Sequence, residues 1–158
     1  MNVSEIYSLE DCYAYVTSPN TWASTVNKGS TYYFSPFTLP TNHKIQFKLK
    51  GTTNGIKIGC GDTTHTNASG YLEWIYAWYT TTLYYRTSNN SETSTSVSVN
   101  PNTNSIYTVE YNGTSLKIYS DNTQLKSVSS YDTLSLTRLL RLNGDSVNNF
   151  DWIKVKSL

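Results

Sequence analysis

Apolar and polar residues alternate with a period of two in short runs along most of the chain, and this pattern constrains the fold most strongly. The run 44–50, KIQFKLK, puts Ile45, Phe47 and Leu49 on one face and polar side chains on the other. Similar runs occupy 56–60, 95–99, 106–111, 115–120, 136–144 and 150–158. No segment has the periodicity of an amphipathic helix. Strands of this length between polar turns predict an all-β fold, a two-sheet antiparallel β-sandwich of the jelly-roll kind.

The length and composition predict a single domain, spanning 1–158, that does not bind nucleic acid. Twelve basic and 11 acidic residues give a formal charge of +1, so charge does not favour nucleic acid or an anionic membrane as a partner. No run of 18 apolar residues is present, so the sequence predicts no membrane insertion. No signal peptide pattern is visible at the start. Low charge with many hydroxyl and amide side chains is typical of virion, extracellular or cell-surface domains, and we expect such a location.

The two cysteines, Cys12 and Cys60, form either a disulfide or two buried thiols. Cys60 shares a strand face with Ile56 and Ile58, which points towards the core. This placement favours the two thiols.

Three segments, taken together, resemble the concanavalin A-like lectin/glucanase superfamily. They are YSLEDCYAYV at 7–16, YTVEYNGTSLKIYSDNTQLKSVS at 107–129 and LLRLNGDSVNNFDWIKVKSL at 139–158. The order of strands and the Asn-Gly turn carry the resemblance, which extends to modules of viral tail proteins and microbial adhesins. It implies two curved sheets with a concave face on which relatives bind or cleave carbohydrate.

The acidic residues argue against catalysis at this stage. Glucanases of the superfamily carry carboxylates two and four positions apart on one strand, and no two of the 11 acidic residues here have that spacing. Glu73 is alone on its strand. Carboxylates of different strands could still meet at about 5–10 Å. Phosphate-binding loops and nucleophile elbows are also missing from the sequence. We therefore predict that the protein is not an enzyme and requires no cofactor.

A structural calcium ion is the bound metal that we consider. The resemblance implies it, because some carbohydrate-binding jelly rolls hold calcium between acidic groups near the two ends of the chain. Glu10, Asp11 and Asp151 occupy those places, and calcium prefers several such oxygens. The alternative is turn capping and surface solvation by the same carboxylates.

The segment 71–86, YLEWIYAWYTTTLYYR, holds seven aromatic residues and predicts a hairpin that turns at Thr80–Thr82. This turn pairs Tyr76 with Arg86 and Trp78 with Tyr84. One face then carries Ile75, Ala77, Tyr79, Leu83 and Tyr85, the other Trp74, Tyr76, Trp78, Tyr84 and Arg86. The second set suits a sugar-binding surface on the concave face, since rings stack on sugars and arginine bonds hydroxyls. Arg141 and Asn143 join it, because they lie opposite Leu140 and Leu142.

These observations predict a non-catalytic carbohydrate-binding module that recognises cell-surface or other polysaccharide, as part of a viral tail, receptor-binding or adhesin protein. The first alternative is a structural or assembly domain that uses the aromatic face to contact a homo-oligomer or neighbouring domains. The second is a polysaccharide hydrolase or lyase. Packing of the aromatic residues within the sheet is a further interpretation of the same face.

Overall fold

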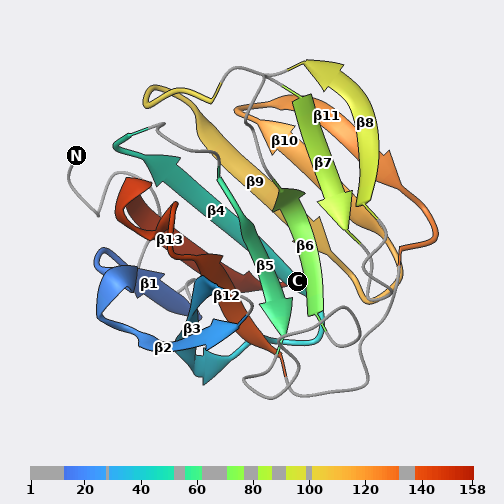
Figure 1. Cartoon of the computed structure of the whole chain (residues 1–158). Coiled ribbons are helices and arrows are strands. Elements are labelled where there is room, and N and C mark those ends of the chain that lie inside the picture. Colours follow the sequence, from blue (N-terminus) through green and yellow to red (C-terminus); the bar gives the residue numbers. More distant parts are fainter. Residues whose placement is uncertain are drawn as a thin grey trace.

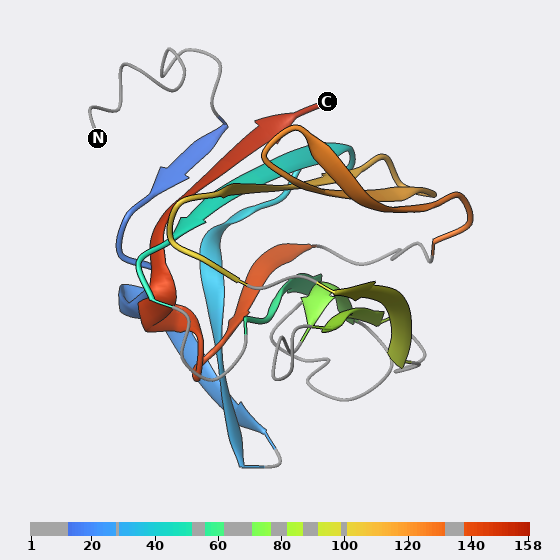
Figure 2. The same cartoon turned by 90° about the horizontal axis from the view of Figure 1, so that it is seen from above.

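The computed structural model describes a sandwich of two antiparallel β-sheets (Figure 1). The described residues are 13–27, 29–51, 56–61, 71–76, 82–86, 92–98, 101–131 and 138–158. Figure 2 shows the two sheets as separate layers, with the hairpin of β2 and β3 projecting on the side away from the six-stranded sheet. The predicted all-β jelly-roll sandwich is confirmed.

The six-stranded sheet has the order β1-β13-β4-β9-β10-β11. Its strands are β1 (Ala14–Val16), β13 (Phe150–Ser157), β4 (His43–Leu49), β9 (Ile106–Tyr111), β10 (Leu116–Ser120) and β11 (Thr123–Val128). The β9–β10 turn follows from Asn112, whose side-chain oxygen accepts hydrogen bonds from the amides of Thr114 and Ser115. Gly113 lies between Asn112 and Thr114 and has a φ of +92°, which glycine adopts without strain.

The seven-stranded sheet has the order β2-β3-β12-β5-β6-β7-β8. Its strands are β2 (Ala23–Asn27), β3 (Ser30–Thr38), β12 (Leu139–Asn143), β5 (Ile58–Gly61), β6 (Tyr71–Tyr76), β7 (Thr82–Arg86) and β8 (Glu92–Ser98). Two short 3-10 helices, Pro19–Thr21 and Val147–Asn149, precede β2 and β13. Within the described ranges, no helix is long and apolar enough to cross a bilayer.

The core lies between the sheets and is built from the apolar face of each strand. In β4, Ile45, Phe47 and Leu49 are buried while Lys44 and Gln46 are half-buried on the other side, as the alternation predicts. Cys60 is fully buried among these apolar side chains, where its strand pattern placed it. Cys12 lies outside the described residues, so the preference for two thiols stays a prediction.

Candidate functional site

The candidate site is the face of the seven-stranded sheet that points away from the core. It is called the open face below, although the residues of its central strands β5 and β12 are almost all buried. Leu140 and Leu142 of β12 are fully buried between the sheets. Arg141 and Asn143 alternate with them and therefore lie on the open face. The neighbouring strand β5 pairs Gly59, which is also buried, with Arg141.

Arg141 is fixed against an aromatic ring of the adjacent strand. Its guanidinium carbon lies 3.8 Å from the centre of the Tyr32 ring on β3, which is a close cation–π contact. The arginine is 3% exposed, so the surrounding chain and the ring cover most of it. A guanidinium stays charged and presents planar donors, which suits it to hold a carboxylate or pairs of hydroxyls. The centre of this face therefore carries an almost fully buried guanidinium.

The strand register aligns charged residues from four strands in one row across this sheet. Arg141 pairs with Gly59, Gly59 with Glu73, Glu73 with Arg86, and Arg86 with Glu92. Neighbouring strands are about 4.8 Å apart, so the Cα atoms of Glu73 and Glu92 are separated by roughly 10 Å. Catalytic carboxyl groups of glycosidases lie about 5–9.5 Å apart. For Glu73 and Glu92 the structure describes the backbone register alone.

The predicted register of the aromatic hairpin is wrong. Tyr76 pairs with Tyr84 and not with Arg86, while Arg86 pairs with Glu73. The cause is a β-bulge: between these pairs β6 has one residue more than β7, so strict alternation along 71–86 breaks down. The predicted partner of Tyr84, Trp78, lies outside the described residues.

The remaining predictions for the hairpin concern which side of β7 faces the core. Leu83 is fully buried in the core, and the Tyr85 ring packs against it with its centre 5.7 Å from that of Tyr131. Tyr84 lies between them on the open face and is half-buried, which matches the predicted sorting of this strand. For Trp74, Tyr76 and Arg86, the structure describes the strand register alone.

A polar hollow of about 280 Å³ lies where β12 ends beside the β2–β3 hairpin. Asn143 lines it at 4% exposure, and its side-chain oxygen accepts a hydrogen bond from the amide of Asp145 at 2.9 Å. Gly144 binds the Thr31 carbonyl through its amide at 2.7 Å, and a Cβ on this glycine would lie 3.1 Å from that oxygen. The hollow is also lined by Gly29, Ser30 and Tyr33. Its lining is thus held by backbone hydrogen bonds.

The residues predicted to hold calcium are not brought together by the described part of the chain. Asp151 is exposed on β13, while Glu10 and Asp11 lie outside the described residues. The terminal strands do pair, but antiparallel, with the Tyr13 amide bonded to the carbonyl of Val155. Asp151 is four residues from that point, roughly 13 Å along the strand. Among the described residues, no group of three metal-binding side chains occurs. The calcium site stays a prediction.

Sequence reasoning missed the β2–β3 hairpin and with it Tyr32, the residue that contacts Arg141. The signal was the turn sequence Asn-Lys-Gly at 27–29 between ASTV and STYYF, two runs rich in strand-forming residues. It also treated Arg141 as a residue of an open surface, whereas the guanidinium is almost fully buried.

Comparison with known proteins supports the fold through solved structures. No family model matches the chain, and no curated protein matches it. One solved neighbour comes from work on endo-acting O-glycanases of human gut microbiota, with 12% identity, a TM-score of 0.58, and coverage of 85% of this chain and 78% of that chain. A second is the Crh5 transglycosylase, with 10% identity, a TM-score of 0.58, and coverage of 91% and 83%. A third is LamA of Zobellia galactanivorans in complex with laminaritriose and laminaritetraose, with 11% identity, a TM-score of 0.51, and coverage of 90% and 76%.

These neighbours correct the functional prediction. They bear the names of glycanases, a transglycosylase and glycosyl hydrolases, so the prediction of a non-catalytic binding module is wrong, as is the prediction of a non-enzyme. Nothing in them supports a viral tail, adhesin or assembly role. Carboxylates two or four positions apart on one strand are missing, but the register places Glu73 and Glu92 on either side of Arg86 across three strands. At 10–14% identity the neighbours establish the architecture alone. The chain has the concanavalin A-like jelly-roll fold.

Proposed function

We propose that the protein is an enzyme that acts on a polysaccharide, as a glycoside hydrolase or a transglycosylase, with its site on the open face. The observation that carries the proposal is the shared fold with enzymes of that kind, one of them solved with laminaritriose and laminaritetraose. Those two ligands are neutral glucose oligosaccharides, so a neutral glucan is the first substrate to test.

The charged row across the open face supplies the chemistry. Glu73 and Glu92 are the proposed pair of carboxylates. Arg86 lies between them in the register, and Arg141 lies on the far side of Gly59 from Glu73. In glycoside cleavage one carboxyl group protonates the leaving glycosidic oxygen, while the other attacks the anomeric carbon or activates water. Water as the acceptor gives hydrolysis, and a second sugar chain as the acceptor gives transglycosylation. Guanidinium groups in the same row are suited to bind sugar hydroxyls.

Two further proposals from the sequence accompany this function. An extracellular or cell-surface location suits a polymeric substrate, and contacts with neighbouring domains or with a second copy stay open to test. The carboxylate chemistry uses no cofactor, so the proposed calcium would act on stability and not on the reaction.

The test is release of new reducing ends from a panel of polysaccharides, namely laminarin, lichenan, xylan and mucin, with product lengths determined by mass spectrometry. We expect activity on at least one neutral polymer, with Glu73→Gln and Glu92→Gln each lowering kcat by a factor of 1000 or more. Asp151→Asn is the matched control, because this exposed carboxylate lies on the other sheet, and it should retain wild-type activity. Products longer than the starting oligosaccharide would identify transglycosylation. Full activity in Glu73→Gln, or no product from any polymer, would contradict the proposal.

A further inference from the structure

The outer face of the six-stranded sheet carries a second hollow, on the opposite side of the sandwich from the open face. It has a volume of about 320 Å³ and crosses β4, β9 and β10. Its lining consists of Lys44, Gln46, Thr108, Glu110, Tyr119, Asp121 and Asn122. The alternation of β4 creates this surface, because Ile45 and Phe47 enter the core and leave Lys44 and Gln46 outside.

Glu110 is the centre of an ordered set of polar side chains in this hollow. Its carboxylate lies 3.3 Å from the Lys44 ammonium, and both side chains are less than one-third exposed. Burial of the Tyr119 hydroxyl raises the pKa of Tyr119. The negative charge of Glu110 and the hydrogen bond that the hydroxyl donates to this carboxylate act in the same direction. The phenol therefore stays a donor at neutral pH. Gln46 donates to the Thr108 hydroxyl at 3.3 Å, which fixes the amide beside this carboxylate.

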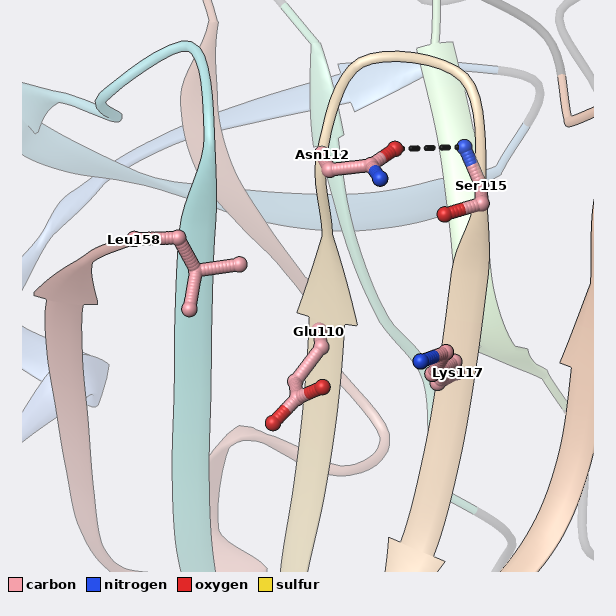
Figure 3. A pocket seen from close by; sticks show the side chains of 5 residues that line it. All are labelled: Glu110, Asn112, Ser115, Lys117 and Leu158. Carbon is pink, nitrogen blue, oxygen red and sulfur yellow. Dashed lines mark hydrogen bonds between the residues drawn. The ribbon is translucent and has the colours of Figure 1, made fainter.

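A smaller hollow of about 70 Å³ continues from the first, because Glu110 lines both. Figure 3 shows Glu110 and Lys117 on neighbouring strands and the turn above them, where the Asn112 side chain accepts a hydrogen bond from Ser115. From Thr108 in the first hollow to Asn112 in the second, β9 rises by roughly 14 Å. Glu110 thus sits at the junction of an elongated polar surface.

We propose that this surface is a second carbohydrate-binding site, which holds a segment of a neutral polysaccharide while the reaction takes place on the opposite face. The half-buried Tyr119 ring offers an apolar platform for a sugar ring, and fixed carboxylate, amide and hydroxyl groups bind its hydroxyls. The inference goes beyond the proposed reaction, since no bond is made or broken here. The choice of a neutral polysaccharide as the ligand rests on the proposed function.

Charge gives an acidic ligand no advantage over a neutral one. The two hollows together hold two carboxylates, Glu110 and Asp121, and two ammonium groups, Lys44 and Lys117, and the Lys44 ammonium already pairs with Glu110. Asp121 also accepts a hydrogen bond from the Ile106 amide, which holds its carboxylate in place. The surface therefore has no excess of cationic side chains that would attract a sulfated or uronic acid polymer.

The test is titration of the isotope-labelled full chain with laminaritetraose, cellotetraose and tetragalacturonate, followed by amide chemical shifts and calorimetry. We expect a neutral probe to shift amides of β4, β9 and β10, equally in the wild type and in Glu73→Gln. Tyr119→Ala should weaken this binding at least fivefold. Tyr119→Phe should weaken it less, because it keeps the ring. Tyr13→Ala is the matched control, since this tyrosine is 52% exposed just before β1 of the same sheet and lies outside the hollow, and it should bind like the wild type.

Several outcomes would overturn the inference. These are shifts confined to the seven-stranded sheet, wild-type affinity in Tyr119→Ala, or a preference for tetragalacturonate. If Tyr119→Ala does not fold, the affinities of Tyr119→Phe and Gln46→Ala are measured in its place. Wild-type affinity in both of these variants would also overturn the inference. Polysaccharide cleavage without binding at the outer face refutes this inference alone. Binding at the outer face in a protein that cleaves no polymer supports the inference and refutes the proposed function.

Discussion

Acidification should destabilise the protein through one buried histidine. His43 begins β4 and is fully buried, with its Nδ1 2.7 Å from the carbonyl of Pro40 and its ring centre 5.3 Å from that of Tyr111. Since a carbonyl only accepts, Nδ1 must carry the proton. Burial lowers the pKa of His43 to about 4, with a smaller contribution in the same direction from the charge of Arg138 and an opposing effect of the Pro40 hydrogen bond. The fold therefore holds a neutral histidine.

The size of the effect follows from the two pKa values. In the unfolded chain the pKa is 6.5, so between pH 6.5 and 4 the unfolded state takes up the proton first. The contribution of His43 is complete above pH 6.5 and falls as the pH drops towards 4. The shift of about 2.5 pKa values corresponds to roughly 3 kcal/mol in total, of which about 2.5 kcal/mol is lost by pH 4.5. That is a large fraction of the 5–15 kcal/mol that stabilises a typical domain.

Urea denaturation at pH 7.5 and 4.5 measures this loss. The wild type should lose about 2.5 kcal/mol more than His43→Gln does over this range. The chain has two histidines, so His65→Gln is the matched control and should keep the wild-type pH dependence if His43 is responsible. An equal loss in the wild type and in His43→Gln would refute the reasoning.

Three other predictions concern stability. Leu142→Ala removes a fully buried side chain and should lower the free energy of unfolding, measured by urea denaturation, by about 2–5 kcal/mol. Val26→Ala, at a position 69% exposed, is the control and should change it by no more than about 0.5 kcal/mol. A cost below about 1 kcal/mol for Leu142→Ala would contradict the core packing. Gly113→Ala should cost roughly 1–2 kcal/mol because of its φ of +92°, since the nearest atom to an added Cβ is 3.5 Å away and space is not limiting; an unchanged urea midpoint would show that the turn does not need this conformation. Chelation should lower the Tm if Glu10, Asp11 and Asp151 hold calcium, and Asp151→Asn should remove that response; a Tm unaffected by chelation and by added calcium rules the site out.

The strands of the six-stranded sheet were the easiest to predict from the sequence. In β4 and β9, buried apolar residues alternate with polar ones because one face meets the core and the other does not. The β2–β3 hairpin lacks this contrast: in STYYFSPFT aromatic residues occupy both faces, and Phe34 is buried although it does not belong to the central core cluster. Alternation therefore does not reveal this pair of strands.

The candidate site could be predicted only in part. Arg141 and Asn143 follow from the alternation of β12, but the contact of Arg141 with Tyr32 depends on a partner strand more than 100 residues away. The bulge in β6 leaves no mark in the sequence, yet it decides that Glu73 pairs with Arg86. The alignment of Glu73 with Glu92 also depends on the register of three strands, which residue spacing along one strand does not encode.

The most direct test of the central claim is the crystal structure of Glu73→Gln with laminaritetraose, or with the best substrate from the polysaccharide panel. We predict an oligosaccharide across the open face, over β6, β7 and β8, with a glycosidic bond between positions 73 and 92. If the oligosaccharide binds elsewhere and the open face is empty, while the wild type cleaves the same polymer, the assignment of this face as the catalytic site is contradicted.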